Sequence, residues 1–531
     1  MDTVKPGLTE TGLLETGLTE TGLLETGGKT LWQLINERAD ATPDKRMAID
    51  ETGRTLTFGE YRAWSERIAA GLAARGIGLG TNVSWILPSR FESLVLAAAL
   101  SRLGAIQNPI LPIYRTREVA FITRQSGCRV IIVPGLFRGF DYPPMVTEAT
   151  QDQGVEVIIA DPGLAEGDPA TLPAYVPALT ELRWLFYSSG TTADPKGAKH
   201  SDRSMSAANT GMQWSMEVGP NDKAAVVFPI THVGGLVWLF NAMQTGVELL
   251  MVETFSPADT PRWLGEHGVT CAGAGTVFWL AYLNAQRQLP AGERLMPNVR
   301  IFNGGGAPKP KTLHAEMMAE MGAPVIGGWG LTESPINTMV HVDDPDDKKA
   351  TTDGRACPDV DIRVVIDGHE CGANEEGELR VKGPQVCMGY LDSSLDAEAF
   401  DEDGWFRTGD LGVIDDGGWI SITGRLKDII IRKGENISAK EIEDLLYAHA
   451  AIADAAVIGL PDASSGERAC AVVVLKPDVA LTLADMVSYL KDHQLSMHKI
   501  PEQLEIVATL PRNPSGKVLK KDLRATYGGT T

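Results

Sequence analysis

Residues 187–201 read YSSGTTADPKGAKHS, a run that combines small hydroxyl residues with two glycines and Lys196. A Walker A loop requires G-x-x-x-x-G-K-[ST]; here the lysine precedes the last glycine, which excludes a P-loop NTPase. The run still suits a polyphosphate, because hydroxyls donate hydrogen bonds, glycines allow close backbone approach and lysine supplies charge. The candidate phosphate-binding residues are Ser188, Ser189, Gly190, Thr191, Thr192 and Lys196. A Ser/Thr-rich surface turn is the structural alternative.

The composition indicates a globular protein with more than one domain. The chain has 531 residues, 43% of them hydrophobic and 22% charged, and is too long for one ordinary core. Its net charge of -21 argues against a nucleic-acid or anionic-membrane partner, because such a face needs clustered Lys and Arg. An anionic substrate must therefore meet a local cluster of positive groups. Six cysteines without a C-x-x-C pair predict reduced thiols in a cytoplasm rather than disulfides or a zinc site.

No segment has the pattern of a signal peptide or an integral membrane helix. The N-terminus lacks a basic segment followed by an apolar one. The longest uncharged run, residues 226–243, holds Pro229, His232 and Gly234 and barely approaches the ~20 residues that a membrane helix needs. A buried strand, a loop and a helix are the better interpretation of this run.

Residues 7–27 repeat with a period of five, GLTET GLLET GLTET GLLET G. Glycine at every fifth position disfavours a helix, and the segment carries too little apolar surface to fold alone. We predict a flexible acidic leader over residues 1–28. A docking segment for a partner or a lipid surface is the alternative.

The rest of the chain predicts an α/β protein in two parts. Amphipathic helical patterns alternate with short apolar runs, which favours parallel strands joined by crossover helices. Between residues 360 and 423 the pattern changes to short alternating strands separated by Gly and Asp turns. We predict an N-terminal domain over residues 29–426 and a smaller α/β domain over residues 427–531.

Five further motifs follow the opening loop in order. They are GGWGLTES (327–334), GELRVKGPQVCMGY (377–390), DGWFRTGDLG (403–412), GRLKDIIIRKGENISAKEIE (424–443) and PRNPSGKVLKKDL (511–523). Together the six motifs resemble the adenylate-forming superfamily of acyl-CoA synthetases, peptide-synthetase adenylation domains and firefly luciferase. The resemblance covers roughly residues 30–525. It implies a large N-terminal domain of parallel sheets with a small β-barrel-like part, and a small mobile C-terminal domain. Two positions depart from the family pattern: Ala193 and Trp329 stand where glycine and tyrosine are usual.

The resemblance assigns the nucleotide-binding residues. Thr332 would hydrogen-bond the α-phosphate and Glu333 would ligate Mg²⁺, although such a pair could equally cap a helix. Trp329 offers a flat face for adenine. Asp410 would bind the ribose hydroxyls with help from Arg425, although a lone Gly-Asp is usually a turn.

The resemblance also predicts two poses of the C-terminal domain. In the first, Lys517 bridges the substrate carboxylate and the α-phosphate as the catalytic cation; without its motif it would be an ordinary surface lysine. Lys427 matches the family's hinge position. The second pose brings the loop that contains Gly434 beside a channel for the pantetheine arm of coenzyme A.

The acyl pocket is predicted from composition and from the family. Residues 228–241 contain no Asp or Glu, whereas amino-acid-activating relatives place an Asp near here. This difference argues against an amino acid substrate. Apolar lining candidates are Phe228, Trp238, Phe240, Phe278 and Trp279, all of which could instead be core. His232 is a candidate gate between thiol channel and acyl site, or a buried structural histidine. Gly304, Gly305 and Gly306 would bring backbone close to adenine and acyl group, and could free room for a bulky acid.

These observations predict an enzyme, an ATP-dependent acid–CoA ligase. It would use Mg²⁺, with ATP and coenzyme A as co-substrates, and would act on a fatty acid or a bulky alicyclic acid. Two alternatives remain: an acyl-AMP ligase that loads a carrier protein, and a non-catalytic homologue that only binds nucleotides. The presence of Lys196, Glu333, Asp410 and Lys517 argues against the last.

Overall fold

The structure is a computed structural model. It describes residues 23–24, 28–188, 195–306, 309–432, 435–462, 465–513 and 516–528. Of the predicted site residues, Ser189, Gly190, Thr191, Thr192 and Gly434 lie outside these ranges.

A six-stranded sheet occupies the N-terminal region, and its strands are parallel except for the edge strand β10, which is antiparallel to its neighbour. In spatial order they are β10 (Lys196–His200), β9 (Trp184–Ser188), β4 (Ile106–Pro109), β3 (Asn82–Trp85), β5 (Val130–Val133) and β8 (Glu156–Ile159). One face packs on α4 (Thr116–Gln125) and α5 (Tyr142–Thr150), and the other on α2 (Phe58–Ala74) and α3 (Phe91–Leu103). Every strand residue of β5 is buried, because helices cover both faces of a parallel sheet.

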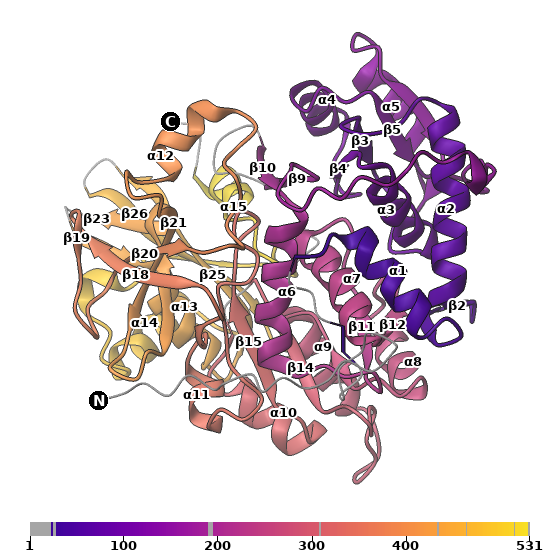
Figure 1. The fold of residues 1–531 in the computed structure, drawn as a ribbon. Coiled ribbons are helices and arrows are strands. Elements are labelled where there is room, and N and C mark those ends of the chain that lie inside the picture. Colours follow the sequence, from indigo (N-terminus) through magenta and orange to yellow (C-terminus); the bar gives the residue numbers. More distant parts are fainter. Residues whose placement is uncertain are drawn as a thin grey trace, which may run out of the picture.

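A nine-stranded sheet lies beside the first (Figure 1). Its strands, in spatial order, are β17 (Arg355–Ala356), β16 (Thr338–Met339), β15 (Val325–Trp329), β14 (Ile301–Gly305), β13 (Cys271–Ala272), β11 (Lys223–Val226), β12 (Glu248–Met251), β1 (Arg46–Asp50) and β2 (Thr55–Thr57). The six from β15 to β1 are parallel. One apolar core joins both sheets through α1 (Leu31–Ala41), α3, α6 (Asp202–Met216) and α7 (Val233–Thr245). The uncharged run 226–243 forms the end of β11, a loop and most of α7, as predicted.

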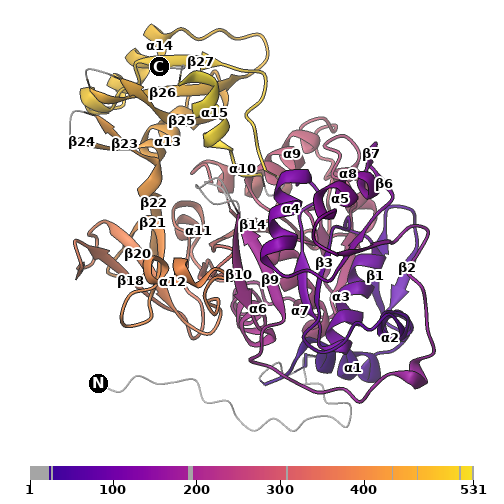
Figure 2. The ribbon, with the colours of Figure 1, turned by 90° about the horizontal axis from the view of Figure 1, so that it is seen from above.

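Two smaller sheets follow. The first is antiparallel, with strands β19 (His369–Glu370), β18 (Asp361–Ile366), β20 (Gly377–Lys382), β21 (Phe406–Ile414) and β22 (Ile420–Arg425). The second contains β24 (Glu435–Ser438), β23 (Ile429–Arg432), β26 (Gly466–Leu475), β25 (Ile452–Asp462) and β27 (Gln503–Ile506), packed with α13 (Ala439–Tyr447), α14 (Leu483–Asp492) and α15 (Lys520–Tyr527). Figure 2 shows the elements after β22 as a separate lobe. The predicted α/β fold, with a larger N-terminal and a smaller C-terminal part, is confirmed.

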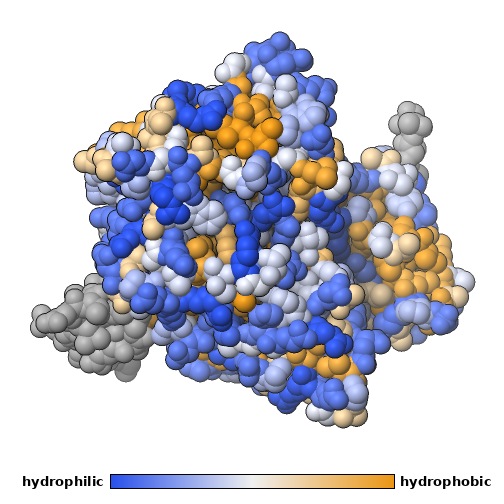
Figure 3. Space-filling model, turned by 90° about the vertical axis from the view of Figure 1, so that its right-hand side faces the viewer, coloured by the Kyte–Doolittle hydropathy of each residue, from blue (hydrophilic) through white to orange (hydrophobic). Residues whose placement is uncertain are grey.

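The remaining α-helices and β-strands connect or flank these sheets. They are α8 (Thr260–Glu266), α9 (Thr276–Gln286), α10 (Leu313–Met321), α11 (Asp346–Thr351), α12 (Asp396–Ala399), β6 (Leu136–Phe137) and β7 (Phe140–Asp141). In the part of the chain that the structure describes, no helix has both the length and the apolar character needed to cross a bilayer. The face in Figure 3 is largely hydrophilic, with separate apolar patches.

One residue of the predicted leader belongs to the core. Leu24 is fully buried, and its N–H donates to the carbonyl of Gln244 at the end of α7 (2.8 Å). A leucine side chain that leaves water stabilises the fold by about 1.5–3 kcal/mol. The expectation of a leader without core contacts is therefore wrong for Leu24.

Candidate active site

A large cleft lies between the N-terminal sheets and the C-terminal lobe. Its volume is about 2820 Å³, and its walls come from β9, β10, α7, α9, β14, β15, β21, β22 and the C-terminal lobe. A pocket for one drug-sized ligand usually has about 300–1,000 Å³. The cleft therefore has room for several ligands at once.

Glu333 is fixed at one wall of this cleft by two hydroxyl groups. Tyr390 Oη donates to Glu333 Oε1 (2.8 Å), and Ser188 Oγ at the end of β9 donates to the same oxygen (3.2 Å). Glu333 is 7% exposed. Both bonds use Oε1, which leaves Oε2 for a cation. One carboxylate oxygen beside phosphate oxygens and waters is a normal part of a Mg²⁺ shell, so the residue fits its predicted role.

Lys196 and Thr332 lie around the same carboxylate. Lys196 begins β10, and its Nζ is 5.5 Å from the ring centroid of Tyr390. Both Lys196 and Thr332 line the cleft. The backbone carbonyl of Thr332 is 3.0 Å from His200 Nε2. Burial lowers the pKa of His200 to about 4, so that this histidine is neutral and acts as a structural support.

Asp410 is held by two donors on opposite sides. Arg425 Nε forms an ion pair with Oδ1 (2.8 Å), and Trp329 Nε1 donates to Oδ2 (2.7 Å). The first contact follows from the antiparallel register, in which Asp410 of β21 pairs with Arg425 of β22. Trp329 is 7% exposed and packs with Val364 and Leu379. It thus both orients Asp410 and presents part of its ring to the cleft.

Lys517 reaches into the cleft from the C-terminal lobe. Its backbone N–H donates to Asn513 Oδ1 (2.8 Å), and the adjacent Gly516 lies against Val277 of α9. Burial, with the positive charges of Arg425 and Lys427, lowers the pKa of Lys517 to about 7, although Asp410 acts in the opposite direction. The structure therefore brings Lys517 to the predicted ribose site.

Lys427 also contributes charge to the cleft. It lies in the 3₁₀ turn Leu426–Asp428, directly after β22. Burial and Arg425 lower its pKa, and the carboxylates of Asp428, Asp410 and Glu333 oppose that shift. The sequence marked this residue only as a hinge. Its side chain adds a second cation near Lys517.

His232 lies at the N-terminus of α7 and lines the cleft. Its Nδ1 accepts a hydrogen bond from the N–H of Gly234 (3.1 Å), and its ring stands edge-on to Phe228. Burial lowers the pKa of His232 to about 4. The imidazole is therefore neutral, with its proton on Nε2.

Strand packing explains why glycines occupy the segment 304–306. A Cβ on Gly304 would lie 2.4 Å from the backbone carbon of Ala274, and one on Gly305 would lie 2.4 Å from the carbonyl oxygen of Gly328. Real Cβ atoms do not approach so closely. These two glycines are needed because neighbouring backbones touch, and the prediction that they free room for a bulky acid is wrong. Gly306, with φ +83°, faces open space.

The apolar wall of the cleft, where the sequence predicts the acyl pocket, is formed by α6, α7, α9, β15 and β16. Phe228, Trp238 and Phe278 line the cleft as predicted, whereas Phe240 and Trp279 are fully buried in the core behind it. The helical period explains the difference, because residues one or two positions apart on a helix point in different directions. Four residues that the sequence did not indicate complete this wall: Met212, Met216, Ile336 and Met339.

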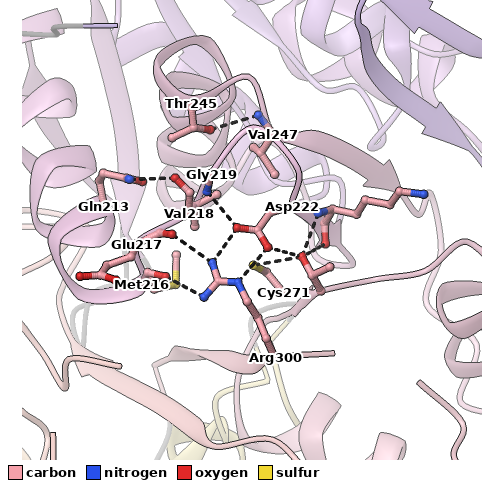
Figure 4. Close-up of polar contacts among 12 residues, drawn as sticks. Gln213, Met216, Glu217, Val218, Gly219, Asp222, Thr245, Val247, Cys271 and Arg300 are labelled. Atoms are coloured by element: carbon pink, nitrogen blue, oxygen red, sulfur yellow. Dashed lines mark hydrogen bonds and ion pairs between the residues drawn. The ribbon is translucent and has the colours of Figure 1, made fainter. Parts of the chain in front are cut away.

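An ion pair fixes the helix that carries two of these methionines (Figure 4). Arg300 bonds both carboxylate oxygens of Asp222 (2.8 and 2.7 Å) and donates to the carbonyl of Met216 (2.9 Å), at the end of α6. Burial alone would raise the pKa of Asp222, but hydrogen bonds from Arg300, Gly219 and Thr270 lower it. The end of α6 is thereby tied to β11 and β14.

Sequence reasoning missed Tyr390 and Asn303. Tyr390 ends the motif at 377–390, and only its place beside Glu333 reveals its role. Asn303 precedes the glycine segment and lines the cleft. Neither position carries a local pattern that distinguishes it from a core residue.

The comparisons with known proteins agree with this site. The chain matches the AMP-binding enzyme family over residues 35–391 and the AMP-binding enzyme C-terminal domain over residues 441–517. It is 31% identical over 524 residues to the medium-chain fatty-acid–CoA ligase of Escherichia coli strain K12, covering 94% of this chain and 90% of that one. It is 32% identical over 534 residues to a salicyl-AMP ligase/salicyl-S-ArCP synthetase of Mycobacterium tuberculosis, covering 95% and 92%.

A solved structure shows the same fold with ligands. The o-succinylbenzoate coenzyme A synthetase of Bacillus subtilis, in complex with ATP and a magnesium ion, superposes with a TM-score of 0.80 at 27% identity. The match covers 93% of this chain and 99% of that one. The chain therefore belongs to the AMP-binding enzyme family and is an AMP-forming acid–thiol ligase, as its motifs predicted.

Proposed function

We propose that the protein is an ATP-dependent carboxylic acid–CoA ligase that forms acyl-CoA, AMP and pyrophosphate through an acyl-adenylate. The observation that carries this proposal is the position of Lys517, which lines the cleft near Asp410, Arg425 and Lys427. The fold alone gives no reason to hold this lysine beside two other cations. A triphosphate and a carboxylate supply one.

The charges in the cleft suit attack of a carboxylate on phosphorus. That step brings two anions together, and cations held in place lower its barrier without a cost of reorganisation. Lys517 would bridge the carboxylate and the α-phosphate, and Lys196 would bind phosphate oxygens. Asp410 would accept hydrogen bonds from the ribose hydroxyls, and Trp329 and Arg425 hold it ready for that contact.

Mg²⁺ would be held by Glu333 together with phosphate oxygens. When bound, it would neutralise charge on the triphosphate. Tyr390 and Ser188 fix the carboxylate that binds it. The burial of Tyr390, with the adjacent Glu333, raises the pKa of the Tyr390 hydroxyl, which therefore stays a hydrogen-bond donor at neutral pH.

The thioester step would require a second pose. After adenylation, Lys517 would leave the cleft as the domain over residues 427–531 turns about Lys427. The turn would bring the loop containing Gly434 beside the thiol channel, near His232. The neutral imidazole of His232 is compatible with a gate, because a charged group there would be costly to bury.

The acid is proposed to be a fatty acid or a bulky alicyclic acid. The apolar wall of the cleft, which we call the acyl wall, is formed by aromatic, aliphatic and methionine side chains, and methionine adapts to irregular apolar shapes. The structure offers no acidic side chain on α6, α7 or β16 where they line the cleft, so an ammonium group would have no partner there.

The test is pyrophosphate release over a panel of acids, followed by addition of an acceptor. Acid-dependent release, with AMP and acyl-CoA formed when coenzyme A is added, is expected. Release of AMP only with a holo-carrier protein would show that the protein is instead a ligase that loads a carrier protein. The name of the salicyl-AMP relative describes such an activity. Nucleotide binding without pyrophosphate release for every acid would refute catalysis.

A further inference from the structure

Asn303 is a buried polar side chain that makes no hydrogen bond. It lies on β14, directly before the glycine segment, and lines the cleft although it is only 4% exposed. Its Oδ1 is buried without a partner, and no partner of Nδ2 is found among the described residues. Nearly all buried amides in folded proteins are satisfied. An unsatisfied amide in the wall of a ligand cleft therefore indicates that a ligand completes it.

The backbone around Asn303 leaves the amide no alternative partner. Asn303 is in register with Ile326 of β15, and the next two glycines are pressed against neighbouring backbone. Gly273 is adjacent: a Cβ built there would lie 3.5 Å from Asn303 Nδ2. These contacts hold β14 at a place where no described protein group pairs with the amide.

Most of the acyl wall is apolar. Ile336 approaches α6 at Gly211, and Met339 lies against Gly328 of β15, next to the glycine segment. The charged groups that the structure describes near Glu333 and Asp410 suit phosphate, ribose and carboxylate. A neutral amide suits a neutral polar group, because a hydrogen bond between the two compensates the cost of burying both. In the tail of a carboxylic acid, such a group is a hydroxyl or ketone oxygen.

We propose that the acid carries a hydroxyl or ketone oxygen on an otherwise apolar body, and that the amide of Asn303 binds this oxygen: Nδ2–H can donate to either group, and Oδ1, which lacks a partner among the described residues, can accept from a hydroxyl. The inference rests on the proposed function and makes it more specific. It predicts that Asn303 discriminates between acids that share a carbon skeleton. A site built to hydrogen-bond a substrate rejects the analogue that lacks the group, because its own polar atoms then stay unpaired.

The test compares pairs of fatty and alicyclic acids with and without a hydroxyl or ketone at defined positions. For at least one position, we expect kcat/KM for pyrophosphate release to favour the oxygenated acid by about 10- to 100-fold. Asn303→Leu should remove this preference and leave the unsubstituted acid as good or better. Asn284→Leu, an exposed asparagine at the same cleft, should retain it. Asn303→Ser serves if the leucine variant fails to fold.

Two results would overturn the inference and leave the proposed function intact. One is equal kcat/KM within every pair for the wild-type enzyme. The other is an equal loss for both members of each pair in Asn303→Leu, which would assign the amide to ATP or to the carboxylate. Absence of pyrophosphate release with every acid would instead overturn the proposed function, and the inference with it.

Discussion

The nucleotide end and the acyl end of the cleft are built in opposite ways. At the end that we propose for the nucleotide, two carboxylates are already paired before any ligand binds: Asp410 with Trp329 and Arg425, and Glu333 with Tyr390. At the end that we propose for the acid, the wall is mostly apolar, and its amide at Asn303 has no partner among the described residues. A paired group is held in one orientation, whereas an unpaired group remains able to form a hydrogen bond with a substrate. We therefore propose that the first end carries out the reaction and that the second end selects the acid.

The difference has a consequence for how variants should behave. Changes at the nucleotide end should affect every acid equally, because all acids pass through the same adenylate. Changes at the acyl end should alter the ranking of acids. The variants below test this separation and the two-pose mechanism, in order of decreasing effect.

Lys517→Ala should give the largest loss. Removing one group that stabilises a developing charge typically costs about 10²–10³-fold in rate, and pyrophosphate release should fall by that factor for every acid. Thioester formation from supplied acyl-adenylate should stay near normal, because Lys517 would by then have left the site. Lys491→Ala, an exposed lysine on α14 of the same lobe, is the control. Equal slowing of both half-reactions would contradict the two-pose mechanism.

Lys427→Pro should show the opposite bias. A fixed φ hinders rotation at the hinge, so thioester formation from supplied adenylate should slow by at least about tenfold. Because the Lys427 ammonium also lies in the cleft, Lys427→Met is needed to measure the loss of charge alone. The difference between the two variants isolates the hinge. If proline and methionine behave alike in the thioester step, residue 427 is not the pivot.

The pH dependence of adenylation should report Lys517. Its pKa is lowered to about 7, and the protonated form is the active one. Activity is therefore present below pH 7 and is lost as pH rises above it. The measurement is kcat/KM, which should fall by about tenfold per pH unit and whose pH dependence reports pKa values of the free enzyme. Lys517→Arg keeps its charge and should move this limb to higher pH. A wild-type profile that stays flat between pH 7 and 9 would show that another cation carries the step.

Trp329→Phe should have a smaller effect. It removes the indole N–H that orients Asp410 but keeps an aromatic face and the ion pair with Arg425. One net hydrogen bond corresponds to roughly a 3- to 10-fold change, expected in KM for ATP and identical for all acids. Trp405→Phe, outside the cleft, is the control. A changed ranking of acids would mean that Trp329 belongs to the acyl end.

Leu24→Ala should lower stability without changing catalysis. Truncation of a buried leucine costs about 2–5 kcal/mol in the free energy of unfolding, measured by the urea midpoint. Turnover per folded molecule should stay constant, because Leu24 bonds to Gln244 at the end of α7 opposite His232 and does not line the cleft. Leu136→Ala is the control, because Leu136 is 65% exposed. An unchanged midpoint would show that Leu24 is not part of the core.

Much of the nucleotide end could be predicted from the sequence, because its roles are tied to local motifs. Glu333 and Lys517 were named from such motifs, and the structure places both in the cleft. The supporting contacts could not be predicted in the same way. Trp329 and Asp410 are 81 residues apart, and Glu333 and Tyr390 are 57 residues apart, and no sequence pattern links members of such a pair.

The sequence by itself determined the α/β class, the family and the chemistry, since hydrophobic periodicity and motif spacing act over short stretches of chain. Only the tertiary structure decided which aromatic residues line the cleft, why Gly304 and Gly305 are glycines, and that Leu24 belongs to the core. It also decided that Asn303 lacks a partner. The physical reason is that burial and hydrogen bonding depend on what the fold brings alongside a residue. Neighbours in space, unlike neighbours in sequence, exist only once the strands and helices have packed.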